Sequence, residues 1–387
     1  MAGLSNISSD ARKEFRTYID EAVFPRSNEW EEREYIPDDV LSDFSGRGYF
    51  GAYIPKTWGG MEMDSLTFGV LCAEIARGNV SLLSMLTVHN MTAQAILRWG
   101  TDEQKSRLLP SLTSGKLHAA FALTEPETGS DASNISTAAV PDDDGYVLNG
   151  AKKWISFSSK ADLFLVIARC PEEGPTAFLI DRNTPGLTVT PMNGLLGFRA
   201  AGVSELTFTD CRVGKDSLLG IPGGGFSYVA GYALDHGRYC VGWGGTGVIA
   251  GCLETSVDYA RNRMQFGRPL RSHQLIQAMV ADMATDMEAA KALAMRAAAS
   301  REGMEPESIM LTSTLKYFTS KAALRAASDA VQIHGGNGCG AEYPVQRYYR
   351  DAKVCEIIEG SSQMQQLMIS RDTFTGALTR RRKRQNR

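Results

Sequence analysis

The chain has 387 residues, of which 43% are hydrophobic and 22% are charged, so it can bury a sizeable core and form two or three domains. Its 41 Lys and Arg against 44 Asp and Glu give a net charge of −3, which argues against a dedicated nucleic-acid binder. The seven cysteines include no Cys-x-x-Cys pair, and the five histidines include no His-x-x-x-His spacing. We therefore expect no metal site.

The same sequence features bear on location. No segment approaches 18 uninterrupted apolar residues, which argues against a membrane span, and the first ten residues lack the basic start and apolar stretch of a signal peptide. An odd number of scattered cysteines is typical of reduced, mostly buried thiols. We expect a cytoplasmic protein.

Residues 1–118 are predicted to form an N-terminal helical domain. Between Leu66 and Ala76 the apolar residues recur at three- and four-residue spacing, which is typical of a helix. A second helix is expected to take Asp102 as its N-terminal cap and to stop at Pro110. Residues 119–222 are predicted to form a middle β domain, because Gly, Pro, Asn and Asp separate β-rich runs there, at 146–156, 163–168, 176–181 and 204–209.

Residues 223–379 are predicted to form a C-terminal helical bundle. One helix carries an apolar stripe that is best explained by buried packing, made of Ile276, Met279, Val280, Met283, Met287, Ala290 and Ala294. The next helix is expected to have Pro306 just inside its start and to end at Gly335-Gly336. Residues 380–387 form a basic tail that we expect to be solvated and disordered; docking to an acidic protein and contact with nucleic acid are the alternatives.

A short glycine pattern, Gly245-Thr-Gly-Val-Ile-Ala250, loosely matches the dinucleotide-binding fingerprint. That fingerprint needs a preceding strand and an acidic residue about 20 residues later in a βαβ unit. The surroundings here are typical of one helix with small residues on a packing face, so we interpret the pattern as helix packing.

Five segments, in order along nearly the whole chain, resemble the acyl-CoA dehydrogenase family. They are Phe121-Ala-Leu-Thr-Glu-Pro-Glu-Thr-Gly-Ser-Asp131, Asn149-Gly-Ala-Lys-Lys-Trp-Ile-Ser156, Tyr259-Ala-Arg-Asn-Arg-Met-Gln-Phe-Gly267, Gln332-Ile-His-Gly-Gly-Asn-Gly-Cys339 and Ile358-Glu-Gly-Ser-Ser-Gln363. The resemblance implies a mainly α fold with a central β-barrel-like domain, between an N-terminal helical domain and a C-terminal four-helix bundle.

The resemblance also implies a flavoprotein that binds FAD, with some contacts reaching the FAD of a neighbouring subunit. A homo-oligomer, dimer or tetramer, follows from that sharing. Flavins need hydrogen bonds at the ring edge, shielding of the ring and cations for the pyrophosphate. The residues that match FAD contacts in the family are Phe121, Leu123, Thr124, Gly129, Ser130, Trp154, Ile155, Ser156, Arg263, Gln265, Phe266, Gln274, Gln332, Gly335, Gly336, Ser361 and Gln363.

The implied reaction is α,β-dehydrogenation of an acyl thioester, with an α-proton going to a base and a β-hydride going to the flavin. Glu359 matches the family's usual base, and its apolar neighbours could raise its pKa toward the working pH. A minority of relatives carry the base two residues after the Asp of an Asp-x-x-Arg stretch, where this chain has Gly237. Arg238 matches an arginine near the thioester end of the site.

Two departures bear on the substrate. Straight-chain fatty acyl enzymes commonly have aromatic residues where this chain has Cys339 and Ile358. That pattern, together with Val241-Gly-Trp243-Gly, is similar to dehydrogenases that act on short polar acyl groups held on acyl carrier protein in secondary metabolism. The alternatives are a dehydrogenase of short or branched acyl-CoA, a flavin oxidase or monooxygenase on the same fold, and a non-catalytic partner protein. The electron acceptor is expected to be an electron-transfer flavoprotein or oxygen.

Overall fold

The computed structural model describes the backbone of residues 11–385 and the side chains of residues 11–376. The chain divides into two compact units, each described by itself. One unit, the sheet unit, comprises residues 16–64 and 78–237, and the other, the helical unit, comprises residues 65–77, residues from 238 onward and those up to residue 15. The helices of the first 118 residues are thus shared between the two units, a grouping different from the three domains that the sequence suggests.

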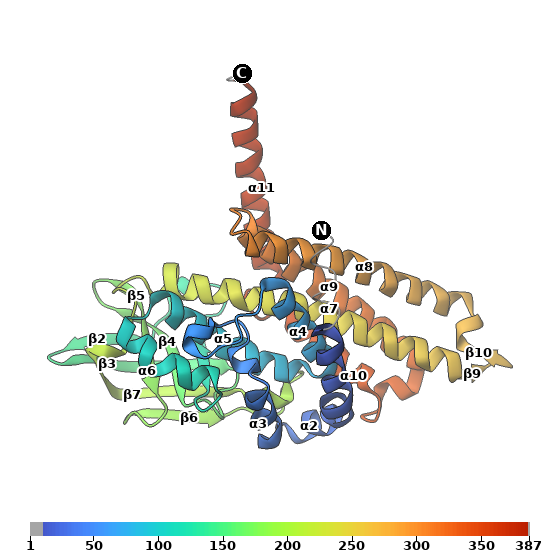
Figure 1. Ribbon diagram of the computed structural model, residues 1–387, viewed down its shortest axis with the longest axis horizontal. Coiled ribbons are helices and arrows are strands. Elements are labelled where there is room, and N and C mark those ends of the chain that lie inside the picture. Colours follow the sequence, from blue (N-terminus) through green and yellow to red (C-terminus); the bar gives the residue numbers. More distant parts are fainter. Residues whose placement is uncertain (1–10, 386–387) are drawn as a thin grey trace. The chain divides into compact units, whose positions relative to one another are not determined.

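The sheet unit contains one eight-stranded sheet (Figure 1) with the order β6-β7-β3-β2-β4-β5-β8, and β1 pairs with β4 off this path. The strands are β1 Ala119–Ala122, β2 Ala138–Asp142, β3 Gly145–Ile155, β4 Leu163–Cys170, β5 Gly174–Asp181, β6 Leu187–Pro191, β7 Ser204–Gly214 and β8 Leu218–Leu219. The four predicted β-rich runs are confirmed as β3, β4, β5 and β7.

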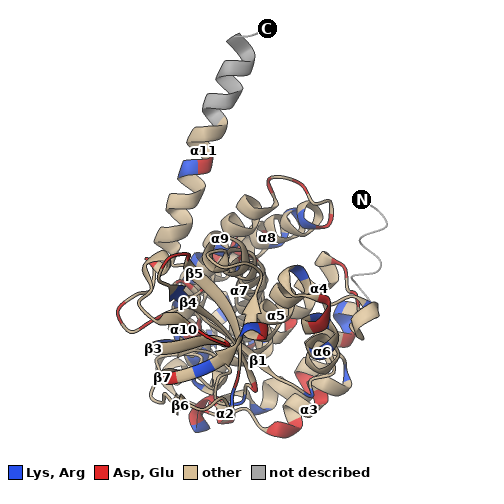
Figure 2. Ribbon diagram, turned by 90° about the vertical axis from the view of Figure 1, so that its left-hand side faces the viewer, with Lys and Arg blue, Asp and Glu red and all other residues tan. Residues whose placement is uncertain are grey.

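The core of this sheet lies around β4. Its residues from Leu163 to Ala168 are all buried and uncharged, and most of the sheet is tan, the colour of uncharged residues, in Figure 2. Strand β4 pairs in parallel with β1 and antiparallel with β5, so it has neighbours on both sides. A continuous apolar run is what a strand with both faces covered requires.

The α-helices that lie wholly within this unit in the described part of the chain are α2 Ser27–Arg33, α3 Asp38–Gly46, α5 Val80–Trp99 and α6 Asp102–Thr113. Helix α5 begins after Asn79, whose side chain accepts a hydrogen bond from the Leu82 backbone N–H at 2.8 Å, as an N-cap does. By length and composition α5 could cross a membrane, but 94% of its apolar window is buried inside the protein. It is the core helix of this unit.

Helix α6 differs from the sequence prediction at both ends. Its N-cap is Thr101, which forms a capping box with Gln104, and Asp102 is the first helical residue. Pro110 lies inside the helix and does not end it. Proline removes one helical N–H, but Leu112 in the last turn is fully buried, and its burial offsets that loss.

The helical unit contains α4 Ser65–Gly78, α7 Gly231–Asn262 from Arg238 onward, α8 Gln274–Glu302, α9 Ser308–His334, α10 Pro344–Cys355 and α11 Ser362–Gln385. A short hairpin, β9 Met264–Gln265 and β10 Arg268–Pro269, joins α7 to α8. In Figure 1, helix α11 extends away from α8 and α9. Its backbone is helical to Gln385, past residue 379, where we expected the bundle to end. The side chains of the basic tail lie outside the described residues.

The long helices confirm most of the predicted pattern. The stripe on α8 is buried from Met283 onward, whereas its first members, Ile276 to Val280, are only half-buried. Helix α9 ends at Gly335 as predicted, in a left-handed conformation with φ 60°. Pro306 precedes the helix and is not in its first turn, because the N-cap is Glu307.

The glycine pattern at residues 245–250 lies within helix α7, so the packing interpretation is confirmed. A Cβ added at Gly245 would lie 2.7 Å from Thr319 of α9, and one at Gly247 would lie 1.9 Å from the Ala73 carbonyl of α4. The seven cysteines are all free, and only Cys339 is exposed, as expected for reduced thiols.

Candidate active site

Glu359 lies in the short turn between α10 and α11, in the helical unit. Its backbone is in the left-handed region with φ 53°, and Gly360 follows at φ 84°. A non-glycine residue in this region stores strain, and such strain clusters at functional sites. The two positive φ values in succession make this a tight turn, and Gly360 is the residue that adopts such a conformation without strain.

The two carbonyl groups of this turn accept hydrogen bonds from three helices. Arg238 Nε of α7 donates to the Glu359 carbonyl at 3.1 Å, and Lys316 Nζ of α9 donates to the Gly360 carbonyl at 2.9 Å. Gln365 Nε2 of α11 donates to both carbonyls, at 3.2 and 3.0 Å. The backbone that carries Glu359 is thus held in place by charged and amide donors.

The Glu359 carboxylate itself has a different environment. Its Oε2 atom is buried and has no hydrogen-bond partner among the described residues. Burial raises the pKa of Glu359 to about 7, with the nearby Arg238 and Lys316 charges opposing the rise and Cys240 adding to it. A carboxyl group with this pKa can accept a proton near neutral pH.

Arg238 donates a hydrogen bond to the backbone of Glu359. The sequence comparison predicted only that Arg238 lies near the thioester, and it did not predict this contact. Gly237, the alternative base position, precedes it on α7 and offers no acid. Glu359 is therefore a buried carboxyl group with an unpartnered oxygen, in a turn that three helices hold in place.

In the sheet unit, the predicted flavin contacts lie on two adjacent segments. Phe121 and Leu123, at and just after the end of β1, are buried, and Thr124 is half-buried. Trp154 lies where the β3–β7 register shifts, with φ 64° and 53% of its surface exposed. Such an irregularity re-aims a side chain, and here it turns the indole outward. Ile155 is buried, Ser156 is half-buried, and Gly129 and Ser130 are exposed.

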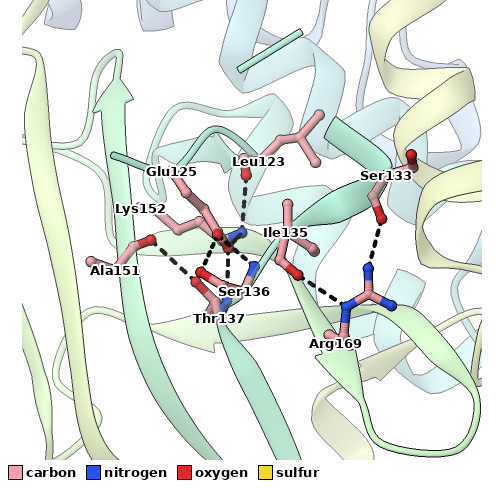
Figure 3. Close-up of polar contacts among 9 residues, drawn as sticks. All are labelled: Leu123, Glu125, Ser133, Ile135, Ser136, Thr137, Ala151, Lys152 and Arg169. Carbon is pink, nitrogen blue, oxygen red and sulfur yellow. Dashed lines mark hydrogen bonds and ion pairs between the residues drawn. The ribbon is translucent and has the colours of Figure 1, made fainter. Parts of the chain in front are cut away.

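A buried ion pair joins these two segments (Figure 3). Lys152 Nζ donates to the Leu123 carbonyl at 2.9 Å and to Glu125 Oε1 at 2.7 Å, and the lysine is fully buried. Glu125 also accepts from the backbone N–H groups of Ser136 and Thr137, at 2.6 and 2.9 Å, and from the Ser136 hydroxyl at 2.7 Å. Each charge therefore has several partners, as a buried ion pair requires.

The titration of Glu125 follows from these contacts. Burial alone would raise the pKa of Glu125, but hydrogen bonds from Lys152, Thr137 and Ser136 outweigh it and lower the pKa to about 2. The carboxylate stays ionised at neutral pH. The pair thus fixes Leu123, next to Thr124, and Lys152, two residues before Trp154.

The predicted cross-subunit contacts surround the β9–β10 hairpin of the helical unit. Arg263, Gln265 and Phe266 are exposed, Phe266 at 93%. Phe266 and Gly267 both have positive φ, 51° and 72°, as a tight hairpin turn requires. Gln274, the first residue of α8, is also exposed. The Arg263 guanidinium makes no ion pair in the described part of the chain, so it is available to an anion.

The remaining predicted contacts lie at helix ends in the same unit. Gln332, Gly335 and Gly336 at the end of α9 are exposed, and a Cβ at either glycine would meet no atom within 4 Å. Ser361 Oγ accepts a weak hydrogen bond from the Met364 N–H at 3.4 Å, which is local capping of α11. Gln363 is exposed.

These observations fit a flavin nucleotide. In the sheet unit, the outward-facing indole of Trp154 and the half-buried hydroxyl of Thr124 can supply ring shielding and hydrogen bonding. In the helical unit, the exposed guanidinium of Arg263 and the open backbone of Gly335 and Gly336 can supply an anion partner and close approach. Within the described residues, no group of three or more His, Cys, Asp or Glu side chains could hold a metal ion.

Four residues that support the site were not predicted as part of it: Lys316, Gln365, Glu125 and Lys152. One of them carries a sequence signal. Lys316 lies in phase with Thr312, Thr319 and Ser320, which are all buried on α9. Lys152 carries none, because the register of β3 with β7 shifts on either side of it and Gly150, two residues before it, is exposed. A lysine in a buried phase is rare unless its charge has partners.

Comparison with known proteins gives the family. Models for the N-terminal, middle and C-terminal domains of acyl-CoA dehydrogenases match residues 8–116, 120–211 and 223–374. Isobutyryl-CoA dehydrogenase of Dictyostelium discoideum is 35% identical over 372 residues, which cover 94% of this chain and 89% of that protein. Butyryl-CoA dehydrogenase from Megasphaera elsdenii has a similar structure, with a TM-score of 0.91 and 32% identity over 95% of this chain and 98% of that chain.

Two further solved structures are similar. A glutaryl-CoA dehydrogenase from Mycobacterium smegmatis in complex with FADH2 has a TM-score of 0.91 and 27% identity, covering 95% of this chain and 94% of that one. A prolyl acyl carrier protein oxidase has a TM-score of 0.89 and 28% identity, covering 95% and 99%. The chain belongs to the acyl-CoA dehydrogenase family. It is an oxidoreductase, and the cofactor of this family is FAD.

Proposed function

We propose that this enzyme dehydrogenates a short or branched acyl thioester and that Glu359 is the base that removes the α-proton. The observation that carries the proposal is the environment of Glu359, a strained residue whose buried carboxyl oxygen has no partner. A carbon acid as weak as a thioester needs a carboxylate that is sheltered from water yet ionised near neutral pH.

FAD, when bound, supplies the acceptor for a hydride. Glu359 takes the α-proton, the electron pair of that C–H bond forms the α,β double bond, and the β-hydrogen leaves with its own electron pair as the hydride. The products are the enoyl thioester, a protonated Glu359 and the hydride, whose electron pair FAD would accept. Arg238, Lys316 and Gln365 hold the turn that aims the carboxylate.

The short or branched acyl group is supported by the names of the isobutyryl-CoA and butyryl-CoA relatives. A second candidate is a short polar acyl group on acyl carrier protein, with a role in secondary metabolism. The similarity to a prolyl acyl carrier protein oxidase favours it, as do Cys339 and Ile358 at positions that are aromatic in straight-chain enzymes.

The test of the base is Glu359→Gln, which keeps shape but cannot take a proton. We expect flavin reduction by a short acyl thioester to slow about 10²–10⁴-fold, the usual value of general-base catalysis, with FAD still bound. Glu356→Gln is the matched control, because Glu356 lies one turn earlier and pairs with Lys353 and Lys321. A Glu359→Gln enzyme that reduces its flavin at the wild-type rate would rule out this base.

The test of the thioester carrier compares one acyl group on CoA and on a carrier protein, without oxygen, in chains with and without residues 380–387. A preference for the carrier that the truncation removes would support the second candidate and a role for the basic tail. Equal specificity constants favour a CoA substrate. Repeating turnover with oxygen or with an electron-transfer flavoprotein identifies the acceptor and tests the oxidase alternative.

A further inference from the structure

Lys316 is a fully buried lysine with an unusual set of partners. None of its side chain is exposed, and its ammonium makes no ion pair within 4.0 Å in the described part of the chain. Its hydrogen bond is to the Gly360 carbonyl at 2.9 Å. Lysines are almost never fully buried unless a carboxylate pairs with them, so this arrangement needs a reason beyond packing.

The acceptor of Lys316 belongs to the turn that carries Glu359. Both residues of that turn have positive φ, and the strain persists only where surrounding contacts hold it. Arg238 and Gln365 hold the turn from α7 and α11, and Lys316 holds it from α9. Removing one of these donors releases one side of the turn, and the direction of the Glu359 side chain changes with it.

Lys316 also acts on Glu359 by charge. The titratable and charged groups that face Glu359 are Arg238 and Cys240 of α7 and Lys316 of α9. Burial lowers the pKa of Lys316 to about 8; Cys355 at the end of α10, Glu359 and Glu356 oppose the fall, and Arg238 adds to it. Lys316 therefore still carries its charge at the pH near 7 where Glu359 titrates. Arg238 and Lys316 are the cations of this set, and both favour the ionised form of Glu359 against its burial.

We propose that Lys316 is a positioning residue of the reaction: its ammonium aims the Glu359 side chain through the Gly360 carbonyl, and its charge favours the proton-accepting form of Glu359. This inference rests on the proposed role of Glu359 as the base. It assigns Lys316 no contact with substrate or cofactor.

Two variants of the FAD-loaded enzyme separate the two effects. Lys316→Met removes both the hydrogen bond and the charge, whereas Lys316→Gln removes the charge and keeps an N–H donor. The matched control is Lys321→Met, on the same helix, because Lys321 is half exposed and pairs with Glu356 at 3.5 Å without contacting the turn.

For Lys316→Met we expect kcat to fall about 10²-fold, the cost of a misplaced reacting group, with KM within about threefold of wild type. In both variants the acidic limb of the pH profile for flavin reduction should move to higher pH, because a nearby cation that favours the ionised form of Glu359 has been lost. Lys316→Gln should retain more of kcat than Lys316→Met. Lys321→Met should leave both quantities unchanged.

The inference is overturned if the acidic limb stays in place in both Lys316 variants, or if Lys321→Met moves it equally. If Lys316→Met does not fold, Gln365→Met tests the same turn from α11. It should lower kcat without moving the acidic limb of the pH profile, and an unchanged kcat in this variant refutes the positioning role.

Glu359→Gln separates the proposed base from the proposed positioning residue. A wild-type rate in that variant defeats the proposed function, whereas a slow Glu359→Gln with normal Lys316 variants defeats only this inference.

Discussion

Replacing Lys152 with methionine would remove the cation of the buried pair in the sheet unit while keeping a long apolar side chain. Glu125, itself only 2% exposed, would lose the ammonium but keep three donors from Ser136 and Thr137. The Leu123 carbonyl would also lose its partner. Breaking a buried ion pair from one side costs about 3–5 kcal/mol, and the three remaining donors place this case near the lower value, about 3 kcal/mol.

The assay is urea unfolding followed by a signal from the sheet unit, with FAD affinity measured in parallel by flavin fluorescence. FAD affinity should weaken, because the pair fixes the segments that carry Thr124 and Trp154. Arg169→Met is the matched control, since Arg169 binds the carbonyls of Ile135 and Ser133 and spares Leu123 (Figure 3). The double variant Glu125→Gln with Lys152→Met should be more stable than Lys152→Met alone, because no charge is left buried.

The contribution of the Glu125–Lys152 pair to the free energy of unfolding should fall at low pH. The pKa of Glu125 is about 2, below its ordinary value of 4.5, so its stabilising contribution is complete above pH 4.5 and is lost as the pH falls toward 2. The difference between wild type and Lys152→Met should narrow across that window. A Lys152→Met chain within about 0.5 kcal/mol of wild type at pH 7 would refute the reasoning, because it would show that the pair contributes no more than a surface ion pair.

Three further outcomes are expected. The rate of flavin reduction should rise with pH through about 7 and then level off, because Glu359 must be ionised to act and its pKa is raised to about 7; a flat profile between pH 5.5 and 8.5 would contradict this. Gly247→Ala should destabilise the chain by about 1–3 kcal/mol in thermal or urea unfolding, since the added Cβ would meet the Ala73 carbonyl. Arg263→Ala should weaken FAD retention in the holoenzyme without changing the stability of the FAD-free chain, because Arg263 is exposed; stable FAD-loaded monomers would argue against a shared site.

The parts of the fold that sequence predicted correctly are those set by local periodicity. The β-rich run of β3 between turn residues and the apolar run of β4 define strands wherever they lie in space, and Gly335 ends α9 because its backbone needs a positive φ. The turn at Glu359 is set only partly by local sequence: Gly360 permits it, but the positive φ of Glu359 depends on the donors from Arg238, Lys316 and Gln365.

Other features depend on contacts that one sequence does not reveal. Pro110 has a poor helical propensity, yet tertiary burial of Leu112 keeps the last turn of α6 helical. The role of Lys316 depends on a carbonyl 44 residues away in the chain, and Glu125 finds Lys152 only when β1 and β3 come together. The phase of Lys316 within α9 marks it as buried, whereas that of Lys152 in the irregular β3 does not, and tertiary structure supplies the partner of each lysine.

The glycines of α7 have one more consequence. A Cβ at Gly242 would lie 2.8 Å from Leu315, and one at Gly245 would lie 2.7 Å from Thr319. Helices α7 and α9 are therefore in close contact just before and just after Lys316. Arg238 lies one turn before Gly242 on α7. The distance between α7 and α9 at this contact therefore sets the distance between the Arg238 and Lys316 charges near Glu359. Adding a single methyl group at Gly242 would change that spacing, and with it the proton affinity of a carboxylate that the substituted residue never touches.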